Sequence, residues 1–210
     1  MTHLYHITHM DNLAGILDRG GLLCDRGCQI EKIPSQQIGY AHIKQRRMIR
    51  KVPLAPKGTL GDYVPFYFAP RSPMLFTIEK RNTPAYQDGQ RPIVHLVTSV
   101  EAVSVAKPKL RWLFTDGHAD IDYSDFFDDL DDLDKIDWPL MSAQMWNDTS
   151  ADGDRKRRRQ AEFLVHGFFP WTLVESIGVM TEQIALEVQQ TLTATGGHSP
   201  QVVRQPRWYY

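Results

Sequence analysis

Cysteine is almost absent from this chain. Only Cys24 and Cys28 occur among its 210 residues, with three residues between them and no second pair. A disulfide framework requires a larger set of cysteines, and zinc sites usually combine such a pair with a second one. The sequence therefore predicts two free thiols and neither of these stapled scaffolds.

Long apolar runs are absent as well. No segment approaches the ~20 consecutive apolar residues that cross a bilayer, and residues 1–12 lack the basic flank and the apolar block of a signal peptide. We therefore expect a cytoplasmic protein that has no membrane partner. Hydrophobic residues make up 42% of the chain and aromatic residues 10%, enough to bury one substantial core. A single domain over residues 1–210 is expected.

Motifs for a resident cofactor or a metal are also missing. The sequence has no GxGxxG segment, so a dinucleotide-binding Rossmann fold has little support. The acidic segment 116–137 has no D-x-D-x-D-G loop with a closing glutamate, and the chain offers no spaced set of metal ligands. No metal is expected.

Charge is nearly balanced overall but strongly segregated. The formal net charge is −1, yet aspartate is concentrated in residues 116–137 and base in residues 43–51 and 155–159. The acidic segment would repel a polyanion, whereas the two basic segments would attract one. Apolar residues recur in the acidic segment at helical spacing, so it is predicted to be a helix with a solvated aspartate face; they are Phe126, Phe127, Leu130, Leu133 and Ile136.

Strands and helices alternate irregularly along the rest of the chain. Apolar periodicity and capping residues predict helices over 12–17, 39–51 and 181–192. Content of β-branched and aromatic residues predicts strands over 4–9, 63–69, 92–99, 111–115, 161–166 and 176–180. Because several strands follow one another without regular helices between them, we expect a mixed α+β architecture and not a doubly wound sheet.

Glu162 is the most unusual residue of these elements. It lies in the strand AEFLVH, where both faces are otherwise suited to burial, and a buried carboxylate is costly unless it is paired or opens into a cleft. One interpretation is a salt bridge to a nearby arginine. The other is an acid held rigidly on a strand so that it stabilises a developing positive charge.

Two further positions are candidates for binding. On the helix over 39–51, Arg47 shares a face with Tyr40 and Ile43, so its head would lie at a pocket edge, where its donor fork suits phosphates and bases. An arginine with a packed stem is also an ordinary structural feature. On the first strand, His6 and Thr8 project together and would line a cleft, although a strand histidine is more often a satisfied core residue.

Six segments taken in order resemble one family. They are LYHITHMDNLAGIL, YAHIKQRRMIRKVP, DYVPFYFAPRSPMLF, FTDGH, QAEFLV and the terminal WYY. In order and spacing they are similar to the DarT-type DNA ADP-ribosyltransferases, toxins of bacterial toxin–antitoxin pairs, over nearly the whole chain. The resemblance implies the ADP-ribosyltransferase fold, a split and twisted β-sheet core with helices around a NAD cleft. It also implies transfer of ADP-ribose from NAD to thymine in single-stranded DNA, and a DarG-type macrodomain antitoxin as partner.

The resemblance also assigns residues. Glu162 matches the catalytic glutamate, and Arg47 matches the arginine beside the target base, which also contacts NAD. The other positions expected to line the NAD cleft are His6, Thr8, Asn12, Gly15, Tyr67, Arg71 and Met74. The basic segment 155–159 is variable in the family, so its cations support DNA binding only in general; the candidate DNA contacts are Arg46, Arg50, Lys51, His118, Lys156 and Arg158.

Other functions remain open at this point. An ADP-ribosyltransferase acting on another base, on RNA or on protein, or the related enzyme that removes an RNA 2′-phosphate with NAD, would use the same cleft. A metal-dependent nuclease could be built on Asp116, His118 and the acidic segment, and a non-catalytic nucleic-acid-binding module on the arginines. Because the chain offers no spaced set of metal ligands, the nuclease and the binding module both rank below an ADP-ribosyltransferase.

Overall fold

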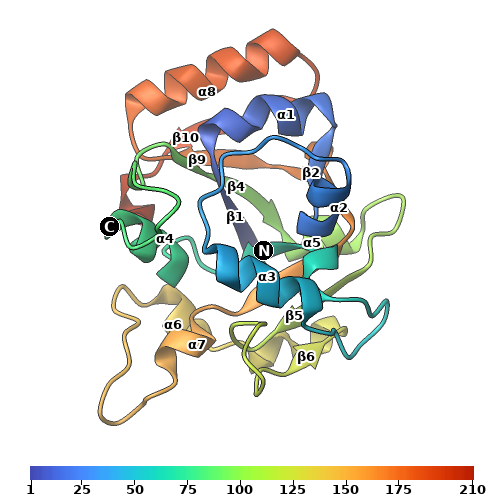
Figure 1. The fold of residues 1–210 in the computed structure, drawn as a ribbon, viewed down its shortest axis with the longest axis vertical. Helices are drawn as coiled ribbons and strands as arrows, with labels where there is room; N and C mark the ends of the chain where they lie inside the picture. The colour runs from blue at the N-terminus through green and yellow to red at the C-terminus, as the bar shows by residue number, and fades with distance from the viewer.

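An eight-stranded sheet forms the centre of the computed structural model, which describes all 210 residues (Figure 1). The strands lie in the order β10-β9-β4-β1-β3-β7-β5-β6, and all neighbours are antiparallel except β9 and β10. Their bounds are β1 His3–His9, β3 Tyr63–Tyr67, β4 Ile93–Ser99, β5 Trp112–Thr115, β6 Phe126–Phe127, β7 Glu162–His166, β9 Ser176–Val179 and β10 Gln201–Arg204. A small second sheet pairs β2, Gly21–Leu23, with β8, Phe168–Pro170.

The large sheet is split between β1 and β3. These strands pair only at Tyr5 and Tyr67, whereas β1 pairs with β4 along its whole length. Pro65 lies in the middle of β3 and has no N–H to donate to a ladder. Its carbonyl instead lies 2.8 Å from Nδ1 of the His6 ring, which bridges the gap where the two strands diverge. This gap is where the sheet opens.

Eight α-helices surround the sheet (Figure 1). They are α1 Leu13–Asp18, α2 Asp25–Ile30, α3 Ala41–Ile49, α4 Pro73–Glu79, α5 Val100–Ser104, α6 Trp138–Ser142, α7 Arg155–Arg158 and α8 Glu182–Thr195. Helices α1 and α8 lie side by side, and the C-terminus lies next to α4. None of the helices is long and apolar enough to cross a membrane.

Helix α8 shows why the predicted elements form where they do. Thr181 caps it, because its hydroxyl accepts a hydrogen bond from the N–H of Ile184. Ile184, Val188 and Leu192 are buried against the core, and the helix ends at Gly196, whose φ of +74° suits glycine. The predicted stripe is confirmed, as are the predicted strands corresponding to β1, β3, β4, β5, β7 and β9.

The predicted helix in the acidic segment is wrong. Residues Phe126–Phe127 form the edge strand β6, where Phe127 pairs with Phe114 and their rings stack with centroids 5.3 Å apart. A 3-10 helix, Leu130–Lys135, and the short α6 follow. Aspartate favours such short turns because its side chain caps nearby backbone N–H groups; the Asp129 carboxylate accepts from the N–H of Asp131. The mixed α+β architecture itself is confirmed.

Candidate active site

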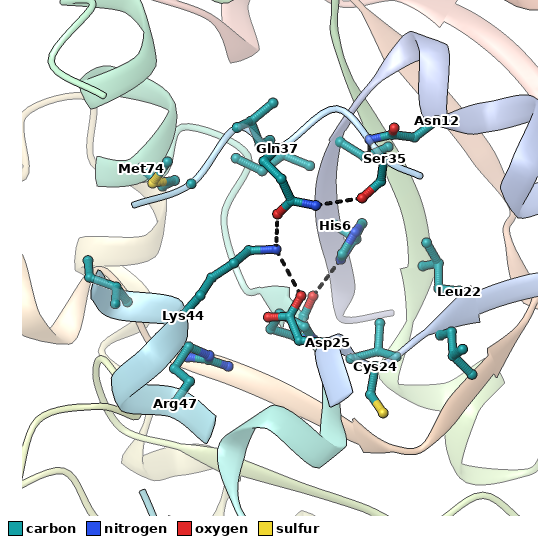
Figure 2. A pocket seen from close by; sticks show the side chains of 18 of the residues that line it. His6, Asn12, Leu22, Cys24, Asp25, Ser35, Gln37, Lys44, Arg47 and Met74 are labelled. Carbon is teal, nitrogen blue, oxygen red and sulfur yellow. Dashed lines mark hydrogen bonds and ion pairs between the residues drawn. The ribbon is translucent and has the colours of Figure 1, made fainter. Parts of the chain in front are cut away.

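A cleft of about 390 Å³ opens at the split between β1 and β3 (Figure 2). Its volume lies in the range of small-molecule sites. The walls come from β1, α1, the β2–α2 region, the loop 31–40, α3, β3, α4 and the start of β7. Segments far apart in the chain therefore meet around one cavity, as the resemblance implied.

Glu162 and Arg47 form an ion pair in this cleft. Glu162 is the first residue of β7 and is 2% exposed, and Arg47, in the last turn of α3, is 8% exposed. Arg47 Nη1 donates to Oε1 of Glu162 over 3.0 Å, and Nη2 lies 2.9 Å from Oε2 without a well-aligned hydrogen bond. The backbone N–H of Ala119 also donates to Oε1 over 3.0 Å. The carboxylate is thus held from two sides.

The electrostatics keep both partners charged. Burial alone would raise the pKa of the Glu162 carboxyl, but the positive charge and hydrogen bonding of Arg47, together with the Ala119 N–H, hold this pKa below its ordinary value. Burial alone would lower the pKa of Arg47, and Glu162 more than reverses that effect. The predicted salt bridge to an arginine is therefore present, and the same carboxylate lines the cleft; its action on a developing positive charge stays a prediction.

The local backbone fixes where this carboxylate lies. The N–H of Glu162 donates to Oγ1 of Thr115 over 3.2 Å, and the Thr115 hydroxyl donates to the carbonyl of Gly117 over 2.6 Å. Helix α3 is tied to the neighbouring segment by ion pairs of Arg46 with Asp120 and of Arg50 with Asp122. Both sides of the Glu162–Arg47 pair are anchored, so the pair has little freedom to move.

Residues of β1 and the following turn line the opposite wall. His6 and Thr8 face the cleft, and burial lowers the pKa of His6, so its ring is neutral. Asn12 donates to Oγ1 of Thr8 over 3.1 Å and to the carbonyl of Gln36 over 3.1 Å, and it accepts from the N–H of Gln36 over 2.7 Å. Asn12 therefore clamps the loop 31–40 to this wall. Gly15 also lines the cleft.

Lys44 closes part of the cleft mouth. Its ammonium donates to Asp25 at the start of α2, over 2.9 Å, and to the side chain of Gln37 in the loop (Figure 2). Lys44 lies one turn before Arg47, so helical spacing could have identified it. Asp25, Cys24 and the loop residues carry no periodic signal, so no sequence pattern predicts their place in the cleft.

The three candidate residues of the segment 67–74 differ in their position relative to the cleft. Tyr67 faces Glu162 across the β3–β7 register, and burial, followed by the charge of Glu162, raises its pKa. Met74 lines the cleft from α4. Arg71 does not line it, contrary to expectation, because its guanidinium lies over the ring of Tyr210, 4.3 Å from the centroid.

Three of the six residues expected to contact DNA, all of them arginines, form ion pairs within the chain. Arg46 and Arg50 are paired as described, Lys51 is exposed beyond the end of α3, and Arg158 contacts Asp137 and Asp152. Only His118 and Lys156 of this set line the cleft. Burial lowers the pKa of His118, and its Nδ1 has no hydrogen-bond partner.

The basic segment 155–159 is therefore not a free arm. Arg155 donates to the carbonyls of Asn147 and Met145, and Arg157 binds Asp154 and Asp116. The donors of these guanidinium groups are therefore bound to aspartates and carbonyls of the same chain. No group of three or more His, Cys, Asp or Glu side chains lies where it could hold a metal ion, so the geometry gives the nuclease alternative no centre.

The comparisons with known proteins agree with this geometry. Residues 5–210 match the family described as ssDNA thymidine ADP-ribosyltransferase, DarT. A DNA ADP-ribosyl transferase of Thermus aquaticus is 44% identical over 211 residues, covering 100% of this chain and 89% of the relative. A more distant match, 28% identical over 116 residues, covers 55% of this chain and 27% of a DNA ADP-ribosyl transferase-DNA ADP-ribosyl glycohydrolase fusion protein of Thermosipho africanus.

Two solved structures are also similar to this chain. Thermus sp. 2.9 DarT in complex with ADP-ribosylated ssDNA has a TM-score of 0.92 and 44% identity, covering 100% of this chain and 96% of that one. Thermus sp. 2.9 DarT in complex with NAD+ has a TM-score of 0.87 and 41% identity, covering 100% and 98%. The expected fold and family are thus confirmed.

Proposed function

The chain belongs to the DarT family of ssDNA thymidine ADP-ribosyltransferases, and from that premise we propose that it transfers ADP-ribose from NAD to a thymine base in single-stranded DNA. The observation that carries this assignment is the ionised Glu162 carboxylate, buried and paired with Arg47 inside a cleft of about 390 Å³. Similar proteins have been solved with NAD+ and with ADP-ribosylated ssDNA.

Glu162 acts on the sugar of NAD. Departure of the positively charged nicotinamide leaves an oxocarbenium-like ribose with positive charge at the anomeric carbon. A carboxylate already held in place by Arg47 and the Ala119 N–H stabilises that charge without reorganising as it develops. This is stabilisation of the transition state beyond that of bound NAD, which is what accelerates the step.

Arg47 acts on the thymine. The attacking ring nitrogen loses a proton during transfer, and an arginine remains protonated in proteins, so Arg47 stabilises the deprotonated base and does not remove the proton. His118 is a neutral imidazole that lines the same cleft, and it can accept this proton. His6, Thr8, Asn12, Gly15, Tyr67 and Met74 are proposed to contact NAD, and Lys156 the DNA strand.

Single-stranded DNA is the simpler acceptor for such a cleft. A thymine ring nitrogen is occupied in a Watson–Crick pair, so a duplex would first have to release the base, which takes a few kcal/mol. We propose that the whole chain works as one domain in the cytoplasm. We also propose that a DarG-type macrodomain antitoxin removes the modification, in keeping with the glycohydrolase fused to the Thermosipho relative.

Mass spectrometry of short oligonucleotides after incubation with NAD tests this function. A thymine-containing strand should gain one ADP-ribose, the same strand annealed to its complement should gain much less, and an RNA strand with uracil should be poorer. The Glu162→Gln variant serves as the control for adventitious NAD chemistry. Equal modification of the duplex, or a preference for RNA, would contradict the proposed acceptor.

A further inference from the structure

Three consecutive backbone carbonyls before α4 are all bound by side chains from distant parts of the chain. The carbonyl of Pro70 lies 3.0 Å from Nε2 of His95. The carbonyl of Arg71 accepts from Nη2 of Arg159 over 3.1 Å and from the Tyr210 hydroxyl over 3.0 Å, and this hydroxyl also lies 3.3 Å from the carbonyl of Ser72. The start of α4, and with it one wall of the cleft, is fixed by these bonds.

Tyr210 joins this wall to a second segment. Its hydroxyl accepts a hydrogen bond of 2.6 Å from Nε1 of Trp146, a residue that is 5% exposed although it lies in the irregular loop between α6 and α7. Gln90 holds the Tyr210 backbone, accepting from its N–H over 3.0 Å and donating to its carbonyl over 2.5 Å. The hydroxyl is therefore a fixed point to which the loop is attached.

Arg159 makes the same connection from the other end of the loop. It is 3% exposed and has no carboxylate partner. Its Nη1 donates to the carbonyls of Leu140, Met141 and Ala143 at the end of α6, and its Nε and Nη2 to Arg71. Burial lowers the pKa of Arg159 to about 10, so it stays charged at neutral pH. A buried cation without a counterion is tolerated because carbonyls satisfy its donors.

The tethered segment leads directly into the cleft. The loop 143–154 projects beyond α6 and α7 (Figure 1), and the residues that follow it include Lys156 and Gln160, which line the cleft beside Glu162. Neither Tyr210 nor Arg159 lines the cleft. Any effect of these two residues on a ligand must therefore pass through the two segments that they hold, residues 143–160 and the start of α4.

We propose that Tyr210 and Arg159 are positioning residues that hold residues 143–160 as the acceptor-side wall of the cleft. This inference rests on the proposed function, because it supposes that a DNA strand approaches along Lys156. Loss of the tether weakens binding of the oligonucleotide. The NAD side of the cleft, built mainly on β1, α1 and the loop 31–40, keeps its geometry, because in each single variant the start of α4 is still held by His95 and by the remaining partner of the Arg71 carbonyl.

The test compares Tyr210→Phe with Tyr209→Phe. Both remove one hydroxyl from neighbouring tyrosines and keep the ring. The Tyr209 hydroxyl, however, bonds to the carbonyls of Ile93 and Gly178 and contacts Nδ1 of His95, all in the central sheet, and it does not bond to the loop. We expect Tyr210→Phe to raise KM for a thymine oligonucleotide about tenfold, the effect of losing one well-formed hydrogen bond. KM for NAD and the slow hydrolysis of NAD without DNA should change less than about twofold.

Hydrogen exchange gives a readout that does not depend on activity. In Tyr210→Phe and in Trp146→Phe, which removes the other partner of the same bond, amides of residues 143–154 should exchange faster, and in Tyr209→Phe they should not. Arg159→Lys, which keeps the charge but loses the fork of donors, should behave like Tyr210→Phe.

Three outcomes would overturn the inference. They are a parallel loss of NAD hydrolysis and DNA modification in Tyr210→Phe, the same rise of KM for the oligonucleotide in Tyr209→Phe, and unchanged exchange of the loop. If the wild-type chain modifies no oligonucleotide, the proposed function fails and so does the acceptor-side role, whereas faster exchange would still establish the tether itself.

Discussion

Replacing Glu162 by glutamine separates the charge of this side chain from its shape. The amide oxygen can take the place of Oε1 and accept from both Arg47 and the Ala119 N–H, each now at 3.0 Å. What is lost is the negative charge opposite the developing cation on the ribose. Removing one preorganised group of this kind typically lowers the rate by ~10²–10³, and we expect at least that loss of transfer, with NAD affinity changed less than about threefold.

The same substitution has a cost in stability that follows from the buried pair. Breaking a buried ion pair from one side destabilises a protein by about 3–5 kcal/mol because the remaining charge is left uncompensated. The retained hydrogen bonds place Glu162→Gln near the lower limit. At roughly 2–4 °C per kcal/mol for a chain of this size, the melting temperature should fall by about 6–12 °C. The double variant Glu162→Gln with Arg47→Met removes both charges and should recover much of this loss.

Two assays check these numbers independently. Quantitative mass spectrometry of a modified oligonucleotide, under saturating NAD, gives the rate of transfer. Thermal unfolding of the single and double variants gives the interaction free energy between Glu162 and Arg47. Transfer within tenfold of wild type, with NAD still bound, would show that Glu162 is structural. If the double variant is destabilised by the full sum of the losses in Glu162→Gln and Arg47→Met, the pair is not coupled, and the electrostatic argument for its charge state fails.

Three further predictions concern charge. Arg47→Lys keeps a cation beside Glu162 but loses the planar fork, so it should lower transfer to thymine more than NAD hydrolysis; an equal loss in both would mean that Arg47 only holds NAD. Lys156→Gln should reduce the salt dependence of oligonucleotide affinity by about one phosphate contact, a slope change of ~0.7, whereas Arg158→Gln, whose guanidinium is already paired, should not. Burial lowers the pKa of His95 to about 4, below its ordinary value near 6.5. The neutral buried ring therefore contributes fully to stability above pH 6.5, and this contribution is lost as pH falls from 6.5 toward 4. In His95→Asn, the midpoint of urea unfolding should fall less steeply over that pH range than in the wild type.

Much of the fold and the two members of the central pair, but not their contact with each other, could be predicted from the sequence. Strand β7 is apolar on both faces, so a carboxylate at its first position is unusual, and helical spacing predicts that Arg47 shares a face with Tyr40 and Ile43 at a pocket edge. The wall formed by the loop 31–40 could not be predicted, since it depends on Asn12 gripping the backbone of Gln36 and no periodicity marks it. Long-range backbone clamps of this kind leave no local signal.

The ion pairs between the acidic and the basic segments could not be predicted from either segment alone, and the DNA contacts assigned to the cations stay predictions. A run of arginines indicates a nucleic-acid surface only if the side chains are free. Here Arg157 is paired with Asp116 and Asp154, and Arg158 is paired with Asp152. Composition identifies the acidic segment and the basic segment, but which aspartate pairs with which arginine depends on their proximity in the folded chain. Periodicity also misassigned the acidic segment, because aspartates capping short turns gave the same spacing of apolar residues as a helix.

The pairing of these segments explains how a nearly neutral chain can still present a site for a polyanion. The charge of a cation paired with an aspartate is largely cancelled at long range, and with a net charge of −1 the whole molecule does little to steer DNA. On the proposed function, we expect affinity for the strand to come from the few cations that line the cleft, Lys156 among them. The neighbouring arginines bind groups inside the protein: Arg155 donates to the carbonyls of Met145 and Asn147, and Arg157 binds Asp154 and Asp116. The basic character of residues 155–159 therefore reflects mainly what these side chains bind inside the protein, which is the arrangement that our proposal of a rigid support for the acceptor wall requires.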